Sequence, residues 1–74
     1  MPKYPVLKAS EIIRILQILG FEEVRQKGSH KQFKNNEGKS TTVPVHKSRD
    51  VSPILLKQIL KEIDIDLELF KRYL

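Results

Sequence analysis

The 74-residue sequence contains no cysteine. It can therefore form neither a disulfide framework nor a zinc-thiolate site, and it fits the reducing conditions of the cytoplasm. No apolar run approaches the ~20 residues that a membrane-spanning helix needs. Residues 1–5 also lack the apolar core of a signal peptide. We expect a soluble cytoplasmic protein with no membrane association.

Acidic residues are scarce in the middle of the chain. The whole sequence has 14 Lys and Arg against 9 Asp and Glu, a net charge of +5. Between Arg25 and Arg49, seven basic residues accompany one acid, Glu37, which gives this segment a net charge of +6. From Val51 onward, basic and acidic residues balance. This concentration favours a polyanion or an acidic protein as partner, although a solvated basic surface would give the same pattern.

The length is sufficient for one domain. We assign this single domain to residues 1–74, with its core over about residues 10–63. A chain this short buries only about 60% of the surface that its unfolded form exposes. Its core is therefore small, and a bound partner would stabilise it appreciably.

A helix is predicted at each end of this domain. We expect Ser10 to cap the first helix and Gly20 to end it, because glycine takes a left-handed conformation without steric cost. Ser52 followed by Pro53 predicts the start of the second helix. Both helices have apolar residues at helical spacing. These residues are Ile12, Ile15, Leu16 and Leu19 in the first helix, and Leu56, Ile59, Leu60 and Ile63 in the second.

A short third helix is expected over about residues 66–73. Leu67, Phe70 and Leu74 would share one of its faces. That face could belong to the core, or it could form an apolar patch for a partner.

Three strands are predicted between the two long helices, over residues 21–27, 30–35 and 40–45. The turn-forming residues 35–38 would join the second and third strands as a hairpin. Pro44 cannot donate a ladder hydrogen bond, so we expect the end of the third strand at a sheet edge or beyond the pairing. The order helix, three strands, helix predicts an α+β fold of two layers, with both helices on one face of an antiparallel sheet.

Alternation along the strands then divides the side chains between two faces. If Phe33 faces the helices, its neighbours on the second strand face away. The same argument applies to Val43 and Val45 on the third strand. The open face would present His30, Gln32, Lys34, Thr42 and His46.

The two histidines point to proton-transfer chemistry on RNA. RNA can be cut without a metal because its own 2′-hydroxyl attacks the adjacent phosphorus. An imidazole can accept or donate a proton near neutral pH, and lysines bind phosphates and stabilise the developing charge. Gly28 would allow close approach of the backbone, and Ser29 could donate to a phosphate oxygen. The candidate RNA-binding residues are Lys27, Gly28, Ser29, Lys31, Gln32, Lys34, Thr42 and Lys47.

Three short motifs together resemble the HicA family of bacterial mRNA-cleaving toxins. They are Leu-Gly-Phe at 19–21, Gly-Ser-His at 28–30 and Val-Pro-Val-His at 43–46. The resemblance extends from about Ser10 to about Ile63. It implies a fold like that of the double-stranded RNA-binding domain, with His30 as the catalytic histidine of a ribonuclease acting on mRNA. The resemblance alone implies the remaining features, which are a type II toxin-antitoxin system and a HicB antitoxin that masks the site.

The role of His46 stays open, because it could be a second proton carrier or could hold the loop after the third strand. One histidine does not readily act as both acid and base in a single step, so another group, a lysine or a water must share the work. Ser29 is not expected to be a covalent nucleophile, since no acidic residue near it in sequence would orient His30. Two histidines without an arranged carboxylate are too few ligands for zinc. We expect no metal and no other cofactor.

Two other functions are compatible with this sequence. The first is a non-catalytic double-stranded RNA-binding module, although such modules carry a lysine cluster at the start of their last helix and here only Lys57 is nearby. The second is an interaction subunit whose basic face binds an acidic partner. In that case, removing the imidazole of His30 would leave all function intact.

Overall fold

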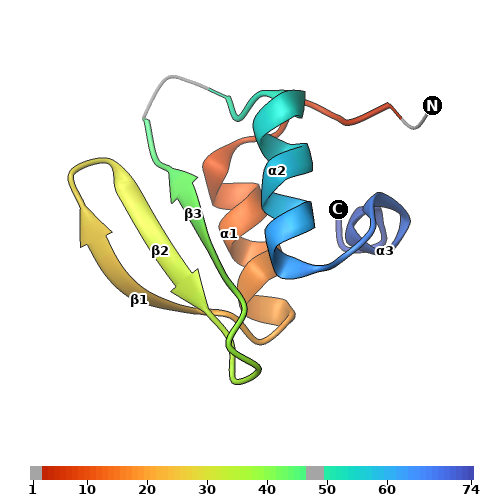
Figure 1. Ribbon diagram of the computed structural model, residues 1–74. Coiled ribbons are helices and arrows are strands. Elements are labelled where there is room, and N and C mark those ends of the chain that lie inside the picture. The colour runs from red at the N-terminus through yellow and green to blue at the C-terminus, as the bar shows by residue number, and fades with distance from the viewer. Residues whose placement is uncertain (1–2, 47–49) are drawn as a thin grey trace.

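The computed structural model describes residues 3–46 and 50–74. The elements follow the order α1, β1, β2, β3, α2 and α3 (Figure 1). The strands form one antiparallel sheet in the order β1-β2-β3. In chain order from α1 to α3, the bounds of these helices and strands are Ala9–Ile18, Glu22–Lys27, His30–Lys34, Ser40–Pro44, Pro53–Ile63 and Leu67–Lys71. This confirms the predicted α+β fold, and the arrangement is compatible with that of a double-stranded RNA-binding domain.

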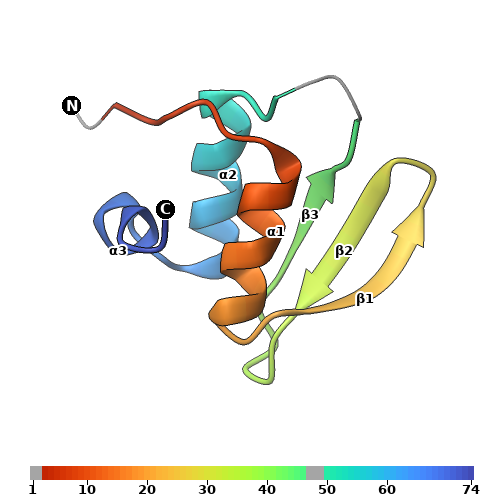
Figure 2. The ribbon, with the colours of Figure 1, turned by 180° about the vertical axis from the view of Figure 1, so that it is seen from behind.

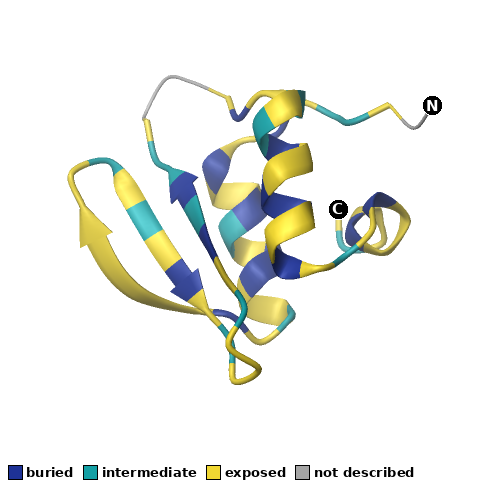
Figure 3. Ribbon diagram, in the orientation of Figure 1, coloured by how far each residue is buried: buried dark blue, intermediate teal, exposed yellow. Residues whose placement is uncertain are grey.

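The hydrophobic core lies where the two long helices meet β3 and the inner side of β2. Figures 1 and 2 show α1 and α2 side by side next to β3, with the β1–β2 hairpin extending away from them. Phe33 and Val43 are the fully buried residues that the sheet contributes. All six residues of β1 are exposed, as the colouring of Figure 3 shows. The outer strand is therefore held by its hydrogen bonds to β2, while the helices stabilise the other side of the sheet.

The first helix begins earlier than the sequence predicted. Lys8, and not Ser10, is the N-cap, and Ala9 is the first helical residue. The backbone N–H of Lys8 donates to Oε1 of Glu11 at 3.3 Å, which satisfies an amide at the helix start. Ala9 is buried in the core, and that burial outweighs the preference of serine for a capping position.

Gly20 ends this helix as predicted. Its φ is +94°, and its backbone N–H donates to the carbonyl of Gln17 at 3.1 Å. The N–H of Phe21 donates to the carbonyl of Leu16 at 2.9 Å. These two bonds form a Schellman motif, in which the left-handed residue lets the chain leave the helix with its last carbonyls satisfied. The chain then enters β1 from a fixed direction.

Ser52 and Pro53 start α2 as predicted, and Oγ of Ser52 accepts from the backbone N–H of Leu55 at 3.2 Å. The C-terminal helix is shorter than predicted, since it covers Leu67–Lys71 after an Asp66 cap. Leu67 and Phe70 are buried in the core, but Leu74 is 51% exposed. The alternative of a three-residue apolar patch for a partner is therefore wrong, because the core already covers two of its members.

Within the described residues, 3–46 and 50–74, no helix is both long and apolar enough to cross a membrane.

Candidate functional site

A two-residue turn, Gly28-Ser29, joins β1 to β2 directly before His30. Gly28 has a φ of +59°, while Ser29 has no positive φ. This pair of signs is that of a type II′ hairpin turn, which requires glycine at its first central position. A β-carbon on Gly28 would meet no atom within 4 Å. The glycine is therefore needed for the backbone conformation of the turn.

The turn is also tied to the third strand. The backbone N–H of Val45 donates to the carbonyl of Ser29 at 2.6 Å. On the central strand, His30 lies opposite Lys27 of β1 and Pro44 of β3. Pro44 is thus within the pairing and on an edge strand, where its missing N–H costs no ladder bond. These contacts hold the exposed His30 in a fixed place between two neighbours.

His46 follows β3 and is exposed. Because β2 and β3 are antiparallel, the start of β2 and the end of β3 lie at the same end of the sheet. The backbone hydrogen bond from Val45 to Ser29 joins the chain at the residues next to His46 and His30. The fold therefore brings the two imidazole-bearing residues to one end of the sheet from positions 16 apart in the sequence.

The open face of the sheet carries most of the candidate residues. Phe33, Thr41 and Val43 are buried on the side of the helices, so their neighbours along the strands face away. The register places Gln32 opposite Thr42. The candidate residues on this face are Lys27, His30, Gln32, Lys34 and Thr42.

Two of the candidate lysines are not placed on this face. Lys31 points to the opposite side of the sheet, where its Nζ lies 3.3 Å from Oε1 of Glu23. It therefore does not share a face with His30. Lys47 lies outside the described residues.

A β-bulge adds a residue to the open face that sequence reasoning did not single out. The register between β1 and β2 shifts between Glu23 and Arg25. Val24, the extra residue, is 59% exposed and lines a hollow. The other lining residues include Gln32, Lys34 and Thr42 of the open face, and also Phe33, Thr41 and Glu62 from the side of the helices. The hollow has a volume of about 310 Å³. The signal available in the sequence was the imperfect alternation of residues 21–27, since bulges place two residues opposite one.

Two contacts join β3 and the β2–β3 turn to α2, at the end of the sheet away from the histidines. Oγ1 of Thr41 donates to Oε1 of Glu62 on α2 at 2.8 Å. In the turn after β2, Nζ of Lys39 lies 3.3 Å from Oδ2 of Asp64 at the end of the same helix.

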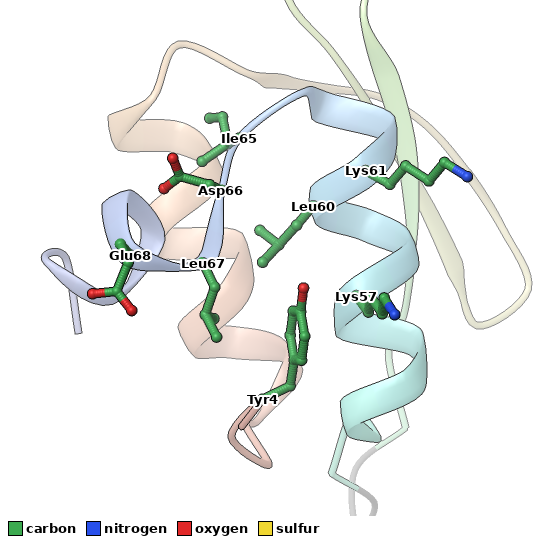
Figure 4. Close-up of a pocket in the computed structure, with 8 residues that line it drawn as sticks. All are labelled: Tyr4, Lys57, Leu60, Lys61, Ile65, Asp66, Leu67 and Glu68. Atoms are coloured by element: carbon green, nitrogen blue, oxygen red, sulfur yellow. The ribbon is translucent and has the colours of Figure 1, made fainter. Parts of the chain in front are cut away.

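A second hollow lies among the N-terminal segment, α2 and α3 (Figure 4). Its volume is about 420 Å³, and Tyr4, Leu60 and Leu67 are among its lining residues. Neither histidine contributes to it. It is separate from the candidate site on the sheet.

The open face offers groups that can exchange protons and bind phosphate. An exposed imidazole beside the cross-strand Lys27 supplies both functions at one place. Within residues 3–46 and 50–74, no three His, Cys, Asp or Glu side chains gather closely enough to hold a metal ion.

The comparisons with known proteins identify the family. Residues 9–65 of the 74-residue chain match the family model of the HicA toxin of bacterial toxin-antitoxin systems. A search of curated proteins found no match. The matched segment begins with α1 and ends just after α2, and it contains the whole sheet with both histidines. The chain therefore belongs to the HicA family of bacterial toxins.

Proposed function

We propose that this protein is a ribonuclease that cleaves mRNA without a metal ion, with His30 as its catalytic residue. The observation that carries the proposal is the position of His30, which is exposed on the open face between Lys27 and Pro44. It directly follows the turn formed by the Gly28-Ser29 pair of the family-like motif. Membership of the HicA toxin family supports a toxic activity for this chain.

The reaction needs only groups that the RNA and the protein supply. The 2′-oxygen attacks the adjacent phosphorus and loses its proton to a base, while the bond from phosphorus to the 5′-oxygen breaks and that oxygen receives a proton. The products are a 2′,3′-cyclic phosphate and a 5′-hydroxyl. His30 transfers one of these protons, and His46, at the same end of the sheet, is the candidate for the other.

Lys27 contributes positive charge where the phosphoryl group becomes more negative. It lies opposite His30 in the strand register, so its ammonium group can bind a non-bridging phosphate oxygen. Gln32, Lys34 and Thr42 continue the same face away from His30. We infer that the RNA strand runs along this face, and that a HicB-type antitoxin inhibits the toxin by covering it.

The test is cleavage of a single-stranded RNA in excess EDTA by the unmodified protein, His30→Ala and His46→Ala. Circular dichroism first establishes that all three are folded. We expect the unmodified protein to cut and His30→Ala to be at least about 100-fold slower. A similar loss of cleavage rate in His46→Ala would make His46 the second proton carrier. An unchanged cleavage rate would mean that His46 instead holds the loop after β3.

Two results would contradict the proposal. Equal cutting by the unmodified protein and His30→Ala would mean that His30 is not catalytic. If neither protein cuts but both bind RNA equally, the chain is a non-catalytic RNA-binding module, which the double-stranded RNA-binding-domain arrangement favours as the alternative. The start of α2 argues against that module, because it exposes Ile54 at 82% in place of a lysine cluster.

A further inference from the structure

The hollow on the open face lies beside His30 along the same strand. Val24 lines it from β1, Gln32 from β2 and Thr42 from β3. Gln32 is two residues from His30 and on the same side of the strand, which is a separation of about 7 Å. A nucleotide placed there would be next to the one whose phosphate is at His30.

Val24 is unusual for this face. Among the described strands, it is the one large apolar residue that is exposed. The bulge between Glu23 and Arg25 leaves Val24 without a partner in the register, while Arg25 lies opposite Gln32. Val24 and Gln32 line the same hollow, and bulges near functional sites commonly redirect a side chain in this way. An exposed apolar wall in a polar hollow suits the flat, apolar face of a nucleobase.

Gln32 and Thr42 supply the polar groups of the same hollow. They lie opposite each other in the register of β2 and β3. In the part of the chain that the structure describes, neither side chain makes a hydrogen bond. The amide of Gln32 carries both donors and acceptors, and such groups distinguish bases by the pattern on their edges.

Charges of both signs lie around the hollow. The carboxylate of Glu62, which accepts from Thr41, lines it from α2, and Arg25 lies opposite Gln32 in the register of β1 and β2. The apolar side chain of Val24 and the neutral amide of Gln32 suit a base, and the basic residues suit the phosphates on either side of it. Lys34 lines the hollow two residues beyond Gln32, where it can bind the next phosphate of the strand.

We propose that this hollow binds the base of a nucleotide adjacent to the cleaved bond and gives the protein a sequence preference. The base packs against Val24 and forms hydrogen bonds with Gln32 and Thr42, while Lys34 holds the following phosphate. The inference rests on the proposed ribonuclease function. It adds the residues that select where the RNA is cut.

The test uses a pool of single-stranded RNAs with randomised positions, whose cleaved ends are sequenced. Gln32→Leu removes the amide at nearly constant volume, and Gln58→Leu makes the same change on an exposed residue of α2. We expect the unmodified protein and Gln58→Leu to prefer one base at a position adjacent to the cut by about 5- to 100-fold. Gln32→Leu should reduce that preference to less than about 2-fold and still cut RNA.

A second variant tests the apolar wall. Val24→Thr keeps the shape of the side chain but makes the wall polar, so it should slow cutting of the preferred sequences more than of the others. If the preference persists in Gln32→Leu, or if the unmodified protein cuts without preference, the inference is overturned while the ribonuclease proposal stands. If the unmodified protein does not cut RNA at all, the ribonuclease proposal fails and this inference fails with it.

Discussion

Replacement of Phe33 by alanine tests the division of the sheet into a buried and an open face. Phe33 is fully buried, and a buried phenylalanine removes about 150–250 Å² from water. At about 25 cal/mol per Å², this burial contributes about 4–6 kcal/mol, part of which the alanine retains. We therefore expect Phe33→Ala to lower the free energy of unfolding by about 3–5 kcal/mol. A 74-residue chain has a total of only about 4–11 kcal/mol, so the variant should be close to unfolding.

The assay is urea unfolding followed by circular dichroism, with Gln32→Ala as the matched control. With an unfolding slope near 1.5 kcal/mol per M, the midpoint should fall by roughly 2 M or more in Phe33→Ala. Gln32 is exposed on the other face, so its replacement should change stability by less than about 0.5 kcal/mol. If Phe33→Ala is too unstable to measure, Phe33→Leu should cost about 1–2 kcal/mol. A greater loss in Gln32→Ala than in the Phe33 variants would reverse the faces and remove His30 from the open one.

Two further predictions concern the lysines and the turn. Lys27→Gln and Lys34→Gln should each reduce the slope of log affinity against log salt concentration by about 0.7 in a filter-binding assay with single-stranded RNA. Lys31→Gln should not change this slope, because Lys31 faces the other side and pairs with Glu23; equal effects of all three would place the RNA elsewhere. Gly28→Ala should lower the unfolding free energy by about 1–2 kcal/mol in urea, because a side chain is strained at a φ of +59°. Unchanged stability would contradict the assigned turn.

The sequence was sufficient to predict the order of the elements and most of their bounds. Helical spacing, the Ser52-Pro53 start and the Gly20 end depend on residues close together in the chain, and each was confirmed. The cap of α1 was predicted wrongly because the burial of Ala9 depends on the core and not on local preference.

The candidate site shows the same division between local and tertiary information. Local alternation along β2 and β3 was enough to predict which side chains face away from the helices, including His30 and Gln32. It could not predict that Lys31 pairs with Glu23, because that contact depends on the register between β1 and β2. The register also contains the bulge at Val24, which puts Arg25 opposite Gln32, and only pairing between separate strands determines that bulge.

The sequence by itself therefore determined the fold class, the motif at residues 28–30 and the family resemblance, since these depend on residue types and short spacings. Only the tertiary structure decided that His30 and His46 lie at one end of the sheet, and that Lys27 shares the face of His30 while Lys31 does not. The physical reason is that hydrogen bonds between strands fix neighbours across the sheet, and these bonds join residues distant in the chain.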